Sequence, residues 1–80
     1  MVLNKDRNGR IKLQTLLRSV RREAGLTQSQ VADKLNQPQS YVSKYESGER
    51  RLDLLELKAV CNATGVSLEK FVSRFLEDAK

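Results

Sequence analysis

The apolar residues of this chain recur at helical spacing, in short stretches separated by residues that end helices. In the first stretch they follow the pattern i, i+3, i+4, i+7 and i+11, which places them on one face of a helix. These residues are Leu13, Leu16, Leu17, Val20 and Ala24. Gly25 follows them, at the position after a helix where a left-handed backbone costs glycine little. No segment alternates as a β-strand does, so the pattern predicts helices and no sheet.

The later stretches carry their own start signals. Two pairs of residues have the spacing of a capping box, a proline precedes one stretch, and a serine can cap the last. In chain order these signals are Thr27 with Gln30, Pro38, Asp53 with Glu56, and Ser67. Gly48 and Gly65 are the matching stop signals. Each remaining stretch is therefore expected to form one short helix.

The sequence predicts an all-α fold, a compact five-helix bundle. Residues 1–9 lack apolar periodicity and are expected to form a flexible N-terminal arm, and residues 10–80 form the folded domain. The fourth helix is expected to turn one apolar stripe inward: Leu54, Leu57, Val60, Cys61 and Thr64. Cys61 is interpreted as a core residue rather than a redox group.

The composition excludes several classes of chemistry. The chain has 80 residues, no histidine and one cysteine. It therefore lacks the residues for a Ser-His-Asp triad, a histidine-ligated zinc site or an internal disulfide. We expect a single domain that is not an enzyme and needs no metal or cofactor. The apolar runs are too short for a membrane span and the N-terminus has no signal-peptide pattern, so a cytoplasmic protein without a membrane partner is expected.

The charge is concentrated in the first third of the chain. The formal net charge is +5, and residues 1–25 alone carry seven basic and two acidic groups. Such a field suits a polyanionic partner, nucleic acid above all. A solvated basic surface that only aids solubility explains the composition equally well.

Residues 27–47 have the organisation of a helix-turn-helix. Two short helices at 28–35 and 39–47 are joined by a turn of about three residues, so the second helix can lie in the DNA major groove. Its exposed side carries short polar groups and one cation, which suit base edges and phosphates. These residues are Gln39, Ser40, Ser43 and Lys44. An inert helical hairpin is the alternative.

Two runs of residues resemble the Cro/CI-type (XRE) helix-turn-helix family of phage lambda-repressor-like proteins. One runs from Gly25 to Leu35 and includes Leu-Thr-Gln, and the other runs from Pro38 to Arg50 and includes Ser-Lys-Tyr-Glu-Ser-Gly. The resemblance covers about residues 10–77. It implies a five-helix DNA-binding domain that acts in transcription, commonly as a homodimer. The chain departs from many members at Asn36, where they have Gly, but Asn tolerates the same left-handed backbone.

The resemblance assigns roles to individual residues. Gln28 corresponds to a glutamine that contacts phosphate and supports the recognition helix. Gln39, Ser40, Ser43 and Lys44 match positions that contact bases or adjoining phosphates. Tyr41 either flanks a thymine methyl group or covers the helix, and both interpretations stay open. Arg50 and Arg51 match the phosphate-contacting loop, with a solvated charged run as the alternative.

Arg21 and Glu46 match an ion pair between the first helix and the recognition helix. An acidic side chain on a helix that faces DNA is unfavourable unless it is neutralised. The pair would fix the recognition helix and leave Arg21 near a phosphate. Two independent surface charges, worth little in stability, are the alternative.

The leading functional hypothesis is a small, sequence-specific transcriptional regulator, a repressor of bacterial or phage origin that binds double-stranded DNA as a homodimer. Its dimer interface is expected where the C-terminal third exposes more apolar residues than one stripe can bury: Leu55, Phe71, Phe75 and Leu76. A complete monomer is the alternative. The competing function is an antitoxin-type interaction module that masks a toxin partner and represses its own operon.

Overall fold

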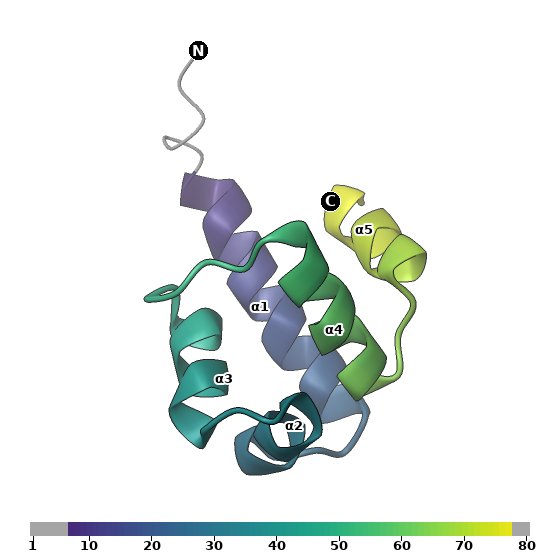
Figure 1. The fold of residues 1–80 in the computed structure, drawn as a ribbon. Coiled ribbons are helices and arrows are strands. Elements are labelled where there is room, and N and C mark those ends of the chain that lie inside the picture. Colours follow the sequence, from purple (N-terminus) through teal and green to yellow (C-terminus); the bar gives the residue numbers. More distant parts are fainter. Residues whose placement is uncertain (1–6, 78–80) are drawn as a thin grey trace.

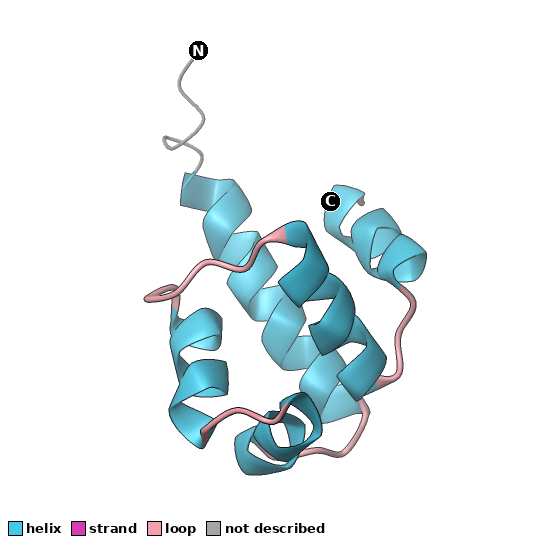
Figure 2. Ribbon diagram, viewed as in Figure 1, coloured by secondary structure: helices cyan, strands magenta, loops and turns pink. Residues whose placement is uncertain are grey.

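The computed structural model describes residues 7–77, and within them it contains five helices and no strand (Figures 1 and 2). The helices are α1 (Arg7–Glu23), α2 (Gln28–Leu35), α3 (Gln39–Ser47), α4 (Leu54–Thr64) and α5 (Leu68–Leu76). The all-α, five-helix prediction is confirmed. α1 runs through the middle of the bundle and contacts both α3 and α5, while α2 packs on α3 and α4.

The helix ends form where the sequence places the capping residues. The Thr27 hydroxyl accepts a hydrogen bond from the backbone N–H of Gln30 at 3.1 Å, and the Gln30 side chain accepts one from the N–H of Thr27 at 2.8 Å. Asp53 and Glu56 form the same reciprocal box before α4. Each box satisfies two backbone donors that the first turn of a helix leaves unpaired.

Helix α1 begins earlier than the sequence pattern predicted. It starts at Arg7, so residues 7–9 are helical and the prediction of a flexible arm was wrong for them. The first turn is Arg-Asn-Gly-Arg, and a turn without apolar residues gives no periodic signal. The rest of the expected arm, residues 1–6, lies outside the described residues.

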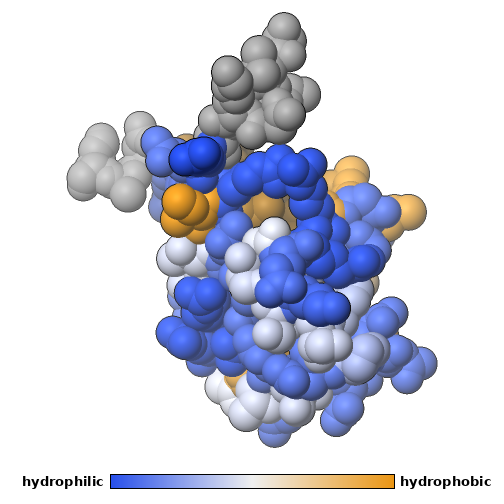
Figure 3. All heavy atoms as spheres, turned by 90° about the vertical axis from the view of Figure 1, so that its left-hand side faces the viewer, coloured by the Kyte–Doolittle hydropathy of each residue, from blue (hydrophilic) through white to orange (hydrophobic). Residues whose placement is uncertain are grey.

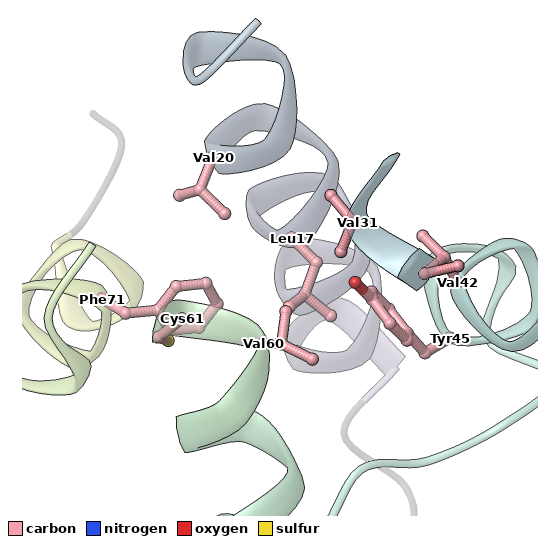
Figure 4. Packing of buried hydrophobic residues seen from close by; sticks show 9 residues of the cluster. Leu17, Val20, Val31, Val42, Tyr45, Val60, Cys61 and Phe71 are labelled. Atoms are coloured by element: carbon pink, nitrogen blue, oxygen red, sulfur yellow. The ribbon is translucent and has the colours of Figure 1, made fainter. Parts of the chain in front are cut away.

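The core is built from residues of all five helices (Figure 4). Leu17 and Val20 come from α1, and Phe71 of α5 points toward Cys61 of α4. Full burial of such side chains stabilises the fold by about 1.5–3 kcal/mol each. The remaining members are Val31, Ala32, Val42, Tyr45 and Val60. Burial on the inner face of α3 therefore fixes that helix on the bundle and leaves its outer face free.

Two predictions about the C-terminal third were wrong. Leu54 was expected on the inner stripe of α4, but its side chain is 65% exposed. As the first residue after the Asp53 cap, it lies at the end of the bundle, where no other helix covers it. Phe71 was expected at a dimer interface, but it is 1% exposed. The broad apolar face of α5 is divided, with Phe71 in the core and Val72 and Leu76 exposed.

None of the five helices in residues 7–77 has both the length and the apolar character that a bilayer crossing requires.

Candidate nucleic-acid interface

The turn between α2 and α3 is set by two residues. Asn36 ends α2 in the left-handed region, with φ of 60°, and the N–H of Gln37 donates to the carbonyl of Ala32 at 2.9 Å. Pro38 then precedes the first turn of α3, where its missing N–H leaves no bond unmade. Buried Val31 and Val42 hold the two helices together across this turn. The arrangement is a helix-turn-helix.

The outer face of α3 is a polar and largely exposed surface. Gln39, Ser40 and Lys44 are exposed, and Tyr41 and Ser43 are half-buried. Figure 3 looks onto this side of the molecule, and most of it is hydrophilic. Amide, hydroxyl and ammonium groups on an exposed helix can reach base edges and phosphates. The structure therefore brings together the five residues that were predicted on the recognition helix.

Glu46 lies behind this face, on the buried side of α3, and is 1% exposed. Arg21 of α1 binds its carboxylate with two guanidinium nitrogens: Nε donates to Oε2 at 2.6 Å and Nη2 donates to Oε1 at 3.0 Å. The hydrogen bond to Glu46 raises the pKa of the Arg21 guanidinium, and burial opposes that effect. The expected ion pair is thus formed, and it is buried rather than a pair of independent surface charges. A buried charge needs such a partner because its desolvation is costly.

Arg18 supports the same residue from one turn earlier in α1. Its Nη2 donates to the backbone carbonyl of Glu46 at 3.1 Å, and its Nε lies 3.8 Å from the carboxylate. Glu46 is therefore bound at both its backbone and its side chain by α1. These contacts fix the position of α3 along α1 and its rotation about its own axis.

Gln28 extends the network to the outer face. Its Nε2 donates to Glu46 Oε1 at 3.1 Å, and its Oε1 accepts a hydrogen bond from Gln39 Nε2 at 2.6 Å. A chain of hydrogen bonds thus runs from Arg21 through Glu46 and Gln28 to Gln39. The bond between Gln28 and Gln39 was not predicted, because nothing in the spacing of two residues on different helices indicates it. It gives the exposed Gln39 amide a partner on α2.

The two arginines after α3 have different surroundings. Arg50 lies over the Tyr41 ring, 4.7 Å from its centre, and its Nη2 pairs with Glu56 at 2.6 Å. Tyr41 in turn packs edge-on against buried Tyr45. Arg51 is exposed, and its guanidinium makes no hydrogen bond or ion pair with any residue in the range 7–77. The two arginines were predicted to act alike, but of the two only Arg50 has an ion-pair partner within residues 7–77.

The other three residues expected at a dimer interface differ in exposure. Leu55 and Leu76 are 77% and 71% exposed, and Phe75 is half-buried. An apolar groove of about 210 Å³ separates α1 from α4 and α5, lined by Leu13, Leu57, Phe71, Val72 and Phe75. Lys12 lies at its edge, with Nζ 5.3 Å from the centre of the Phe75 ring.

Comparison with known proteins agrees with this geometry. A helix-turn-helix family profile matches residues 17–71. A solved structure of an XRE-family like protein from Pseudomonas syringae pv. tomato strain DC3000 is similar, with 38% identity and a TM-score of 0.82 over 91% of this chain and 90% of that one.

The restriction-modification controller protein C.Esp1396I is also similar. The wild-type protein has 26% identity and a TM-score of 0.78, over 85% of this chain and 88% of that one. A single-residue mutant of the same controller protein has 26% identity and a TM-score of 0.79, over 85% of this chain and 91% of that one. No curated protein matches the sequence significantly.

Proposed function

The chain belongs to the XRE family of helix-turn-helix proteins, and from this premise we propose that it represses transcription by binding a specific DNA sequence with α3 in the major groove. It is a DNA-binding regulator and not an enzyme. The observation that carries the proposal is the division of α3 into two faces. Val42, Tyr45 and Glu46 hold the helix on the bundle, and the opposite face offers polar groups to a partner.

The residues on that face have distinct roles in this proposal. Gln39 and Lys44 bind base edges, since glutamine pairs with adenine and lysine reaches the acceptors of guanine. Ser40, Ser43 and Tyr41 contact bases or the adjoining backbone. Gln28 is the first residue of α2, so it contacts phosphate from a helix N-terminus, where backbone N–H groups favour an anion. The bond from Gln28 to Gln39 prepares the Gln39 amide for one base.

We further propose that two copies bind together, through Leu55, Leu76 and the apolar groove beside Phe75. One recognition helix contacts only part of a helical turn, and two half-sites about one turn apart give both affinity and specificity. Exposed leucines and an apolar groove are typical of an interface. The formal charge of residues 53–80 is slightly negative, so the strongly basic part of each copy need not approach the other.

Selection of bound fragments from a random duplex library tests the DNA proposal. We expect one enriched sequence, and expect Gln39→Ala and Lys44→Ala to change the preference at particular bases at a cost of about 1–3 kcal/mol each. Lys58→Ala, which removes an exposed lysine from α4, is the matched control and should change nothing. Absence of any enriched sequence would instead favour the module that binds a toxin partner.

Light scattering across a range of concentrations tests the dimer. Leu55→Glu with Leu76→Glu should give a monomer, while Thr15→Glu should leave the dimer intact. Thr15 is exposed on α1, which contributes neither leucine. A wild-type protein that stays monomeric at every concentration and protects a single half-site would refute the dimer. A dimer that survives both leucine substitutions would refute this interface.

A further inference from the structure

A small hollow lies where the loop after α3 meets α1. Its volume is about 160 Å³. Gly48 brings the loop close to the helix, because its φ is +90° and a Cβ placed on it would collide with the Gln14 side chain. The N–H of Arg50 donates to the carbonyl of Lys44 at 3.1 Å, which turns the chain back after α3. The hollow is therefore built by two segments that are far apart in the sequence.

The floor of the hollow is apolar. Its apolar lining residues are Leu13 and Leu17 of α1, Tyr45 of α3 and Leu52 of the loop. Leu17 and Tyr45 are each 2% exposed and belong to the core, so the packing of the bundle fixes the shape of the floor. Figure 3 shows a recess on this side of the molecule, in which hydrophilic side chains surround an apolar patch. An apolar group that displaces water from such a floor binds favourably.

The charged residues around this floor are all basic. They are Arg10 of α1 and Arg50 and Arg51 of the loop, and none of the lining residues within 7–77 is acidic. Arg50 is already engaged by the Tyr41 ring and by Glu56. The guanidinium groups of Arg10 and Arg51 make no hydrogen bond or ion pair with any of residues 7–77. Like charges beside an apolar surface repel each other more strongly than in bulk water, and an anion in the hollow offsets that repulsion.

The size of the hollow and its two kinds of lining define a ligand with two parts. A protein cavity of about 150 Å³ that is lined by apolar side chains binds benzene. A hollow of about 160 Å³ therefore has room for one six-membered ring. A carboxylate can accept two parallel hydrogen bonds from a guanidinium, which suits the unpaired arginines. An inorganic anion would satisfy the arginines but would leave the apolar floor in contact with water.

We propose that the hollow binds a small organic acid, a carboxylate carried on a single six-membered ring. The ring lies on Leu13, Leu17 and Leu52, and the carboxylate accepts hydrogen bonds from Arg10 and Arg51. Benzoate is the simplest acid of this class. For a ligand with about nine non-hydrogen atoms, we expect a Kd of roughly 1 mM.

Such an acid also weakens DNA binding, and this consequence, unlike the site itself, rests on the proposed function. Arg51 is predicted to contact a DNA phosphate, and the acid takes the same guanidinium. If the acid and the DNA exclude each other, an acid at about ten times its own Kd raises the Kd of DNA about elevenfold. The hollow thus makes the proposed regulator responsive to an organic acid.

Titration of benzoate into the 15N-labelled protein, followed by two-dimensional NMR, tests the site. The amide signals of Gly48 and Leu52 should shift, whereas that of Gly65, which does not line the hollow, should not. Benzamide keeps the ring and lacks the charge, and acetate keeps the charge and lacks the ring. Both should bind at least about tenfold more weakly than benzoate, because each loses one of the two parts.

Two variants remove the free guanidinium groups one at a time. Arg10→Gln and Arg51→Gln should each raise the Kd of benzoate roughly tenfold, the effect of one lost charge-assisted hydrogen bond. Arg22→Gln is the matched control and should leave this Kd unchanged, because Arg22 is an exposed arginine of α1 that does not line the hollow. Circular dichroism establishes that each variant is folded.

Three results would overturn the site. One is a wild-type spectrum that does not change at about 10 mM benzoate, ten times the expected Kd. Another is equal binding of benzamide or acetate, which would show that only one part of the ligand is recognised. The third is an equal loss of affinity in Arg22→Gln and the two variants of the hollow.

The duplex recovered by the selection described above tests the effect on DNA. Its Kd is measured in sodium benzoate and, at equal ionic strength, in sodium acetate. Benzoate should give the elevenfold rise and acetate should not. A protein that binds benzoate with an unchanged Kd for the duplex refutes the effect on DNA and leaves the site standing. If the wild-type protein binds no duplex, the proposed function fails, while the NMR titration still decides the site.

Discussion

The buried ion pair between Arg21 of α1 and Glu46 of α3 should behave as one energetic unit. Replacing each residue singly and then both together tests this through the free energy of unfolding. In Arg21→Met the Glu46 carboxylate stays buried, with only the Gln28 amide and a guanidinium 3.8 Å away to compensate. Loss of one partner of a buried pair costs about 3–5 kcal/mol, and the partial compensation suggests about 3 kcal/mol. In Glu46→Leu the guanidinium keeps the Leu26 carbonyl as an acceptor and some solvent, so about 2 kcal/mol is expected.

The double variant Arg21→Met with Glu46→Leu leaves no unpaired charge, so its loss should be about 2 kcal/mol rather than the sum of about 5 kcal/mol. The free energy of unfolding is measured by urea titration followed by circular dichroism. A domain of this length has roughly 4–12 kcal/mol in total, so each single variant removes a large fraction of it.

The exposed pair between Glu23 and Arg74 is the matched control. It is also bidentate, with N–O distances of 2.8 and 2.9 Å, but its side chains are substantially exposed. The cycle of Arg74→Met with Glu23→Leu should give a much smaller coupling, because solvent screens an exposed pair. If the losses at Arg21 and Glu46 add to within about 0.5 kcal/mol, or if the two cycles give equal coupling, the argument from burial is refuted.

Three further predictions concern the loop, the core and the partner. Gly48→Ala should destabilise the fold more than Gly65→Ala. Both positions need a positive φ, but only at Gly48 does a Cβ meet the Gln14 side chain. Adding Gln14→Ala to each variant should therefore remove the difference in unfolding free energy. Burial, aided by the charge of Glu46, raises the pKa of the Tyr45 hydroxyl above that of an unfolded tyrosine, which is about 10. The free energy of unfolding should therefore fall as pH rises above about 10. In urea titrations, Tyr45→Phe should lose this part of the pH dependence. DNA affinity should fall steeply between low and physiological salt, and a filter-binding Kd that does not change with salt would contradict a footprint of several phosphates.

The local features of this fold could be predicted because their causes are local. A capping box needs two residues three apart, and a left-handed helix end needs a residue that tolerates positive φ, so Thr27, Asp53 and Gly65 could be interpreted from their neighbours alone. The pair of Arg21 and Glu46 came from resemblance to a family, since no spacing rule relates residues 25 positions apart. Its burial was visible only once α1 and α3 were in place.

The errors and omissions arise from how the helices meet. Leu54 belongs to an apolar stripe by spacing, yet it lies past the end of the helices that would cover it. The division of α5 between buried Phe71 and exposed Leu76 depends on the angle at which α5 crosses α1 and α4. Periodicity shows how wide an apolar face is, but not which part of it a neighbouring helix covers.

The two faces of α3 bear on how such a protein changes its target over evolution. The side chains of Ser40 and Lys44 are exposed and make no hydrogen bond within residues 7–77, so in the proposed complex substitutions there can alter base preference at little cost in stability. Gln39 differs, because its amide is already bonded to Gln28, which is bonded to Glu46. A substitution at Gln39 therefore releases a second side chain on another helix. In the proposed complex, a substitution at Ser40 or Lys44 therefore changes the DNA contacts alone, whereas one at Gln39 also changes the surroundings of Gln28.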